Sequence, residues 1–89
     1  MIAVDTNVVV RFLTADNPTQ SRKSRLLFEK HDVWLSRTVI LETEWVLRGA
    51  YKLDRTSVNN ALLALISMEG VEVEDYSVVT EALTLNRDG

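Results

Sequence analysis

Apolar and polar residues follow each other in blocks that predict short buried strands separated by helices. The first block is apolar up to Val4 and then ends at a carboxylate, Asp5, so that a strand is expected at 2–5. A short continuous apolar run of this kind is typical of a strand buried in a parallel sheet. Two more short strands are expected at 33–35 and 71–75, the second with alternating apolar and acidic positions.

Helical periodicity fills the segments between these strands and after them. Asn17 is a suitable cap for one helix because Pro18 fits its first position and Gln20 follows three residues after the cap. Ser36 and Asp54 are expected to cap two later helices. The expected helices are 6–13, 18–30, 37–51, 55–68 and 77–87.

The resulting order of elements is β-α-α-β-α-α-β-α. Strands separated by helical crossovers imply a mostly parallel sheet covered by helices. The expected fold class is therefore α/β, with three α/β/α layers. Gly70 is placed to end the helix at 55–68. Residues 1–89 are expected to form a single domain, because a chain of 89 residues is long enough for one core.

The helix expected at 37–51 carries two glutamates, which a helical wheel separates. On an apolar face centred on Val39, Glu42 falls about 60° from the centre, on the flank of the face. Glu44 points away from that face together with Arg48, four residues later, as a surface ion pair. The wheel thus predicts that Glu42 borders the core and that Glu44 lies on the surface.

Composition excludes several classes of site. With 46% hydrophobic and 26% charged residues the chain is ordinary globular material. It has no cysteine, which excludes disulfides and thiolate metal sites, and its one histidine, His31, does not suffice for a zinc cluster. No apolar run reaches membrane-spanning length and no signal peptide is evident. We therefore expect a cytoplasmic protein without a membrane partner.

Charge is distributed unevenly. The net charge is −3, yet residues 1–55 carry nine Lys/Arg and seven Asp/Glu, a net of +2. Residues 56–89 carry one and six, a net of −5. In the helix at 18–30, Leu26 and Leu27 are expected to face inward. Five cations form a modest basic surface on this half of the chain and offer contacts to phosphates. They are Arg11 of the preceding helix and Arg22, Lys23, Arg25 and Lys30 of this one. The same distribution is equally explained without any phosphate contact, if the two halves of the chain simply have solvent-exposed surfaces of opposite net charge.

Two carboxylates are candidates for a metal site: Asp5, at the end of a strand, and Glu42, on the flank of a helix. Carboxylate oxygens are hard ligands that suit Mg²⁺ or Mn²⁺. Such ions activate water for attack on a phosphodiester. Thr6 and Asn7 add a hydroxyl, an amide and backbone N–H groups at a helix start, where phosphates bind.

Each of these positions also has a purely structural interpretation. Asp5, Thr6 and Asn7 are all residue types that cap helices. Glu42 is equally suited to a partly solvated position beside an arginine. The pattern alone therefore leaves open whether these residues hold a metal or only shape the fold.

Residues 2–8 (Ile-Ala-Val-Asp-Thr-Asn-Val) and 41–51 (Leu-Glu-Thr-Glu-Trp-Val-Leu-Arg-Gly-Ala-Tyr) together resemble the PIN-domain family, in particular VapC-type toxins of bacterial toxin–antitoxin pairs. The resemblance extends over the whole chain. It implies an endoribonuclease that cleaves RNA with Mg²⁺ or Mn²⁺, is silenced by a VapB-type antitoxin and forms a homodimer.

The resemblance also implies roles for individual residues. Asp5 matches the first metal-binding aspartate of the family, and Glu42 matches the glutamate of the second motif. Thr6 and Asn7 match supporting positions beside the aspartate. Glu44 matches no catalytic position.

The family pattern continues with a strand, a helix and a strand that bring a third acidic residue, and this chain lacks that segment. Asp88 lies too early to replace it. We therefore expect impaired catalysis, and a first strand that forms a sheet edge able to pair with another chain. The alternative function is a catalytically inactive module that binds an antitoxin or a second copy through an apolar stripe, Leu41 and Trp45.

Overall fold

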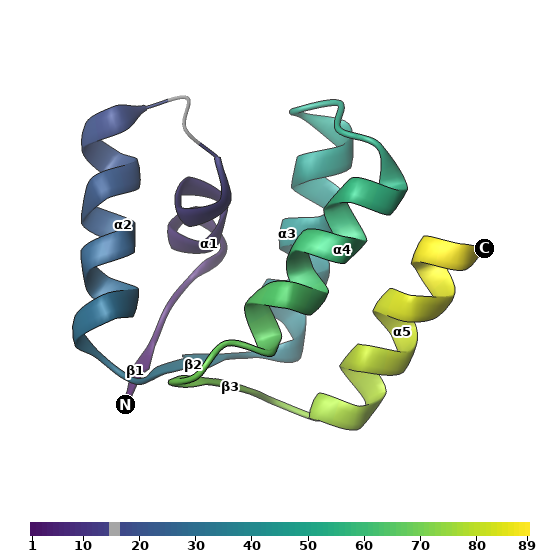
Figure 1. The fold of residues 1–89 in the computed structure, drawn as a ribbon. Helices are drawn as coiled ribbons and strands as arrows, with labels where there is room; N and C mark the ends of the chain where they lie inside the picture. The colour runs from purple at the N-terminus through teal and green to yellow at the C-terminus, as the bar shows by residue number, and fades with distance from the viewer. Residues whose placement is uncertain (15–16) are drawn as a thin grey trace.

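The order of strands and helices expected from the sequence is present in the computed structural model, which describes residues 1–14 and 17–89. Its three strands are parallel and lie in the order β1-β2-β3. The chain is therefore α/β, as expected, and compatible with an α/β/α arrangement. The elements are β1 (Ile2–Ala3), α1 (Thr6–Leu13), α2 (Pro18–Lys30), β2 (Val33–Leu35), α3 (Arg37–Gly49), α4 (Arg55–Ile66), β3 (Val71–Val73) and α5 (Tyr76–Asp88) (Figure 1).

Four helices begin at side-chain caps, three of which were expected from the sequence. In each, an oxygen of the cap accepts a hydrogen bond from the backbone N–H three residues later, which satisfies a donor that the helix leaves unpaired. The caps are Asp5 for α1, Asn17 for α2, Ser36 for α3 and Asp54 for α4.

Several ends differ from the expected ones. The strands expected at 2–5 and 71–75 are two and three residues long, because Asp5 and Asp75 already serve as caps of the following helices. The helix α4 ends at Ile66, so Gly70 does not terminate it. Instead, Gly70 adopts a φ of 84° just before β3, a conformation that glycine adopts without strain.

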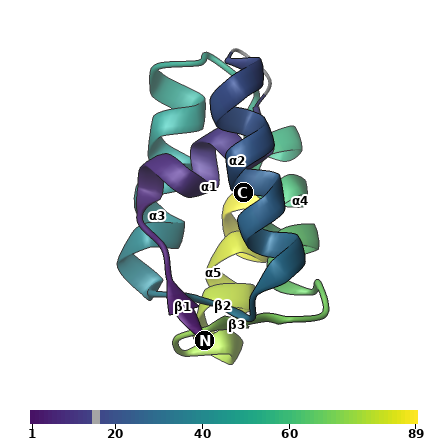
Figure 2. The ribbon, with the colours of Figure 1, turned by 90° about the vertical axis from the view of Figure 1, so that its left-hand side faces the viewer.

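The strand register fixes where the helices begin. Ile2 pairs with Val33 and Ala3 with Trp34, and the same parallel pattern joins β2 to β3. Extending the first register by two residues brings Asp5 level with Ser36, so α1 and α3 begin beside each other at the carboxyl edge of the sheet. Figure 2 shows β1 leading directly into α1, which packs against α3. In the described chain β1 forms one edge of the sheet, as expected.

The core lies between the helices and β2. The helix α1 packs against α2 and α3, α3 packs against α4, and α4 packs against α5. Among the described residues, no helix has both the length and the apolar character needed to cross a membrane. The largest fully buried apolar side chains are Leu35 of β2, Ile40 and Leu47 of α3, Leu62 and Leu65 of α4, and Leu83 of α5.

The helix α2 contacts the rest of the molecule through a narrow stripe of small and aromatic residues. Ser21 and Ser24 are buried, and Phe28 stacks on Phe12 of α1 with ring centroids 4.2 Å apart. Leu27 is partly buried, but Leu26 is exposed, contrary to expectation. Because small serines supply much of the contact, α2 lies close to α1 and leaves a broad face to solvent.

Candidate metal site

Asp5 lies exposed at the carboxyl end of β1 and acts as the N-cap of α1. Its Oδ1 accepts a hydrogen bond of 3.0 Å from the backbone N–H of Val8. The second oxygen, Oδ2, has no partner among the described residues. The cap interpretation is therefore correct, but it uses only half of the carboxylate and leaves the other oxygen available to a cation.

Thr6 and Asn7 follow in the first turn of α1. Thr6 is half-buried and Asn7 is exposed. Within the described part of the chain, neither side chain forms a hydrogen bond. Together with the backbone N–H groups of a helix start, they present unused donors beside Asp5, which is an arrangement suited to an anionic oxygen.

The two glutamates of α3 are placed opposite to the prediction from the wheel. Glu44 is buried, with 8% of its surface exposed, whereas Glu42 is exposed. Arg48 pairs with Glu44 as predicted, through two hydrogen bonds: its Nε donates to Oε2, and its Nη2 donates to Oε1 at 3.2 Å. The pairing was predicted correctly, but the surface position of Glu44 and the core-bordering position of Glu42 were wrong.

The error has a simple physical cause. The buried face of α3 is centred between Ile40 and Leu47, about 90° around the helix from Val39. Apolar residues surround much of this helix, so the pattern does not determine which of them face the core. The guanidinium of Arg48 meets both oxygens of Glu44, which allows the carboxylate to be buried.

This rotation leaves Glu42 on the solvent side of α3 with a free carboxylate. No hydrogen bond or ion pair joins it to any residue in 1–14 or 17–89. It lies six residues after Ser36, hence about 9 Å along the helix from the level of Asp5. Asp5 and Glu42 thus sit on two helices that pack against each other, and no interaction links them directly.

The chemistry of these groups fits a divalent cation that keeps most of its waters. Mg²⁺ is commonly held by one or two carboxylates together with a substrate phosphate. Among residues 1–14 and 17–89, no group of three or more histidine or acidic side chains is placed to hold a metal. Asp5 and Glu42, which have carboxylate oxygens without a partner in the described chain, remain the candidate ligands, each acting with water and phosphate oxygens.

Another pair of acids at the same sheet edge was not singled out from the sequence. Glu74 and Asp75 directly follow β3, as Asp5 follows β1. Glu74 accepts a hydrogen bond of 3.0 Å from the backbone N–H of Arg37, and the Arg37 guanidinium lies 3.0 Å from Asp75. These acids are engaged in holding the start of α3. Their signal in the sequence was their position at the end of the strand expected at 71–75.

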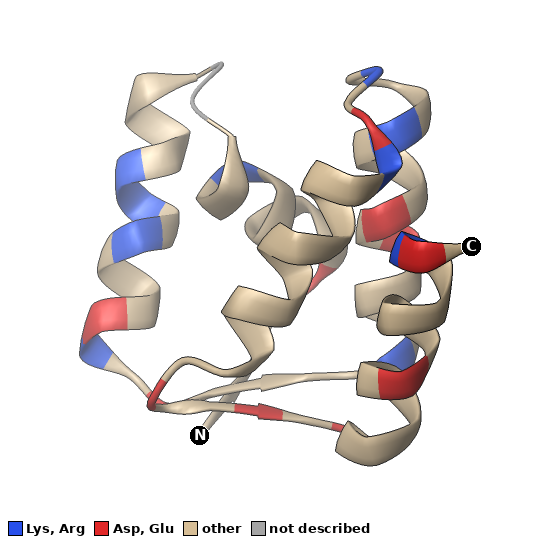
Figure 3. Ribbon diagram, turned by 45° about the vertical axis from the view of Figure 1, so that its right-hand side comes forward, with Lys and Arg blue, Asp and Glu red and all other residues tan. Residues whose placement is uncertain are grey.

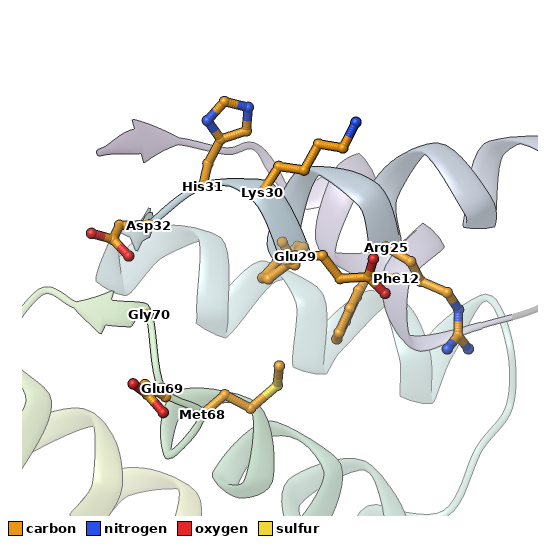
Figure 4. A pocket seen from close by; sticks show the side chains of 10 residues that line it. Phe12, Arg25, Glu29, Lys30, His31, Asp32, Met68, Glu69 and Gly70 are labelled. Carbon is orange, nitrogen blue, oxygen red and sulfur yellow. The ribbon is translucent and has the colours of Figure 1, made fainter.

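A cleft of about 620 Å³ lies at the opposite edge of the sheet, where the residues before β2 and β3 meet α2. Phe12, Phe28 and Met68 give it an apolar part, and Asp32 and Glu69 also line it. In Figure 4, Lys30 and His31 point away from Met68 and Glu69. The cleft is thus separate from the Asp5 end of the sheet, and its lining mixes cations such as Arg25 with the acids Glu29, Asp32 and Glu69.

Comparison with known families gives one match. The model of the PIN domain matches residues 2–88 of this chain. No curated protein and no solved structure matches it.

The different surroundings of the two glutamates predict different effects on stability. Glu44→Gln is expected to lower the free energy of unfolding by about 1–2 kcal/mol, because it weakens charge-assisted hydrogen bonds to Arg48. Glu42→Gln is expected to change it by less than about 0.5 kcal/mol, as for other exposed positions. Urea denaturation at neutral pH measures both values. A larger loss for Glu42→Gln than for Glu44→Gln would contradict the observed rotation of α3.

Proposed function

This chain belongs to the PIN domain family, whose members are generally nucleases, and we propose that it is a divalent-metal-dependent endoribonuclease. PIN domains generally use divalent metal ions and bind RNA. The observation that carries the proposal is the free Oδ2 of Asp5 at the carboxyl edge of a parallel sheet, where open α/β sheets bind their ligands. The acids after β3 are already engaged by Arg37, so they do not compete for this role.

Each residue of the proposed site has a distinct task. Asp5 offers Oδ2 while its Oδ1 stays on the N–H of Val8, so the same hydrogen bond that starts α1 also fixes the orientation of the ligand. Glu42 offers its carboxylate from α3. Thr6 and Asn7 donate hydrogen bonds to phosphate oxygens. A bound Mg²⁺ or Mn²⁺ would lower the pKa of the attacking water and offset the charge of the phosphodiester.

The reaction proposed is hydrolysis of the RNA backbone. The oxygen of water forms a bond to phosphorus, and the bond between phosphorus and one ribose oxygen breaks. The departing ribose oxygen takes up a proton, and the proton lost by water passes to solvent. With two acidic ligands from the described residues, we propose that the reaction is slow.

Within the family we further propose the role of a VapC-type toxin that works in the cytoplasm and is silenced by a VapB-type antitoxin. Exposed apolar residues on α3 support a protein partner: Leu41 is 49% exposed and Trp45 is 70% exposed. They lie four residues apart and so form one stripe on the helix surface. We assign this stripe to a homodimer contact.

Cleavage of RNA tests the catalytic proposal. The chain should cleave a labelled single-stranded RNA in Mg²⁺, stop in EDTA and resume when Mg²⁺ is added back. Asp5→Asn should reduce the rate about 100-fold or more, because it removes a charged ligand of the cation. Asparagine caps helices as well as aspartate does, so this variant keeps the start of α1.

Asp54→Asn is the matched control, because Asp54 caps α4 in the same way at 3.2 Å from the backbone N of Ser57. Hydrogen bonds from the side chain and backbone of Ser57 also lower the pKa of Asp54, so the control removes one charged carboxylate at neutral pH. It should cleave at the rate of the unmodified chain. Equal rates for Asp5→Asn and the unmodified chain, or cleavage that persists in EDTA, would refute the proposed site.

Sedimentation tests the dimer contact. We expect a dimer for the unmodified chain and a monomer for Leu41→Ser/Trp45→Ser, because burial of these side chains supplies much of the association energy. Val78→Ser/Leu85→Ser removes two exposed apolar residues from α5 instead and should leave the dimer intact. Dissociation by the α5 variant alone would place the contact on α5 and contradict the assignment.

A further inference from the structure

The helix α2 is positively charged in a negatively charged chain. It carries four cations and one carboxylate, a net charge of +3, whereas the whole chain has −3. The rest of the chain therefore carries −6. Figure 3 shows this separation, with blue segments along α2 and red segments on β3 and α5. The sign of the local field over α2 is thus opposite to that of the molecule as a whole.

The cations of α2 are also unpaired, whereas three arginines elsewhere in the described chain hold carboxylates. Arg37, Arg48 and Arg87 each pair with a carboxylate. In the part of the chain that the structure describes, no ion pair or hydrogen bond engages the side chains of α2's exposed cations. Those residues are Arg22, Lys23, Arg25 and Lys30. Unpaired cations can neutralise the phosphates of a polyanion, and so release its counterions, without first giving up an intramolecular carboxylate.

The packing of α2 orients these cations to solvent. The buried Ser21 and Ser24 and the partly buried Phe28 face α1, so the other side of the helix faces outward. Arg22 and Arg25, one turn apart, also line a shallow depression of about 290 Å³. Two arginines thus lie on one side of the helix, and guanidinium groups bind phosphate oxygens through planar, forked hydrogen bonds.

The helix with the charged face packs against the helix that begins at the proposed site. Asp5 begins α1, and Asn7 and Arg11 follow on one side of that helix, four residues apart. Phe12 of the same helix stacks on Phe28 of α2. The helix that carries the candidate metal ligand is therefore packed directly on the helix that carries the cations.

We propose that the outward face of α2, centred on Arg22, Lys23 and Arg25, binds the phosphate backbone of the RNA at a distance from the phosphodiester that Asp5 engages. This proposal rests on RNA as the substrate class. An anionic membrane surface fits less well, because a helix that lies on a membrane inserts an apolar face. The exposed face of α2 offers one large apolar residue, Leu26.

The test is the salt dependence of RNA binding by the 89-residue chain. Asp5→Asn in EDTA prevents cleavage, and fluorescence anisotropy of a labelled single-stranded RNA of mixed sequence reports binding at about 50–300 mM KCl. Adding Arg22→Gln/Arg25→Gln should reduce the slope of log K against log salt by about 1.4, since each phosphate contact contributes about 0.7. Affinity at about 0.1 M salt should fall about ten-fold or more.

Lys52→Gln/Arg55→Gln is the matched control, because it removes two exposed cations, one in the loop after α3 and one at the first residue of α4, and changes the net charge equally. It should weaken binding by less than about two-fold. Equal effects of the two double variants would refute the proposal. The proposal would also be refuted if Arg22→Gln/Arg25→Gln lost binding to phosphatidylserine vesicles but kept binding to RNA.

Failure of this proposal is distinguishable from failure of the proposed function. If RNA binding depends on Arg22 and Arg25 but the unmodified chain never cleaves RNA, the α2 surface stands and the nuclease assignment falls. If the unmodified chain cleaves RNA in Mg²⁺ and Arg22→Gln/Arg25→Gln leaves both KM and binding unchanged, the nuclease assignment stands and the α2 surface falls.

Discussion

The parallel pairing of β1 with β2 is the constraint on which the rest of the structure depends. A hydrogen bond of 2.8 Å from the backbone N of Ile2 to the carbonyl of Asp32 begins this pairing, and Ala3 opposite Trp34 continues it. Parallel strands end at the same edge of a sheet, so this register delivers Asp5 beside the start of α3. The helix that Asp5 caps and the helix that carries Glu42 then pack against each other.

The acidic residues around this edge differ in whether their carboxylates have partners, not in residue type. Arg37 engages both acids after β3, and Arg48 engages the buried Glu44. Asp5 and Glu42 remain free, the first through one oxygen and the second through its whole carboxylate. The same division holds for the cations, since those that hold the fold are paired and those on α2 are not. Unpaired groups of both signs therefore lie on α1, α2 and α3, where the nuclease proposal needs them.

Much of the fold followed from local signals in the sequence. The caps Asn17, Ser36 and Asp54 and the parallel α/β order were predicted correctly, because each depends on short-range chemistry or on topology. The rotation of α3 was not, since apolar residues surround that helix and only tertiary packing chooses among them. The same limitation misplaced Leu26 on α2. In the candidate site, the position of Asp5 at the end of a strand followed from the sequence. The exposure of Glu42 did not, because the helical wheel placed the buried face of α3 on the wrong side of the helix.

The central claim is that a divalent cation binds at Asp5 and Glu42. Paramagnetic broadening by Mn²⁺ in a backbone amide spectrum tests it most directly, because broadening falls steeply with distance from the ion and needs no cleavage. The account predicts that substoichiometric Mn²⁺ broadens the amide signals of Thr6, Asn7 and Glu42, and that Asp5→Asn abolishes the effect. Broadening centred on Glu74 and Asp75, or unchanged broadening in Asp5→Asn, would contradict it.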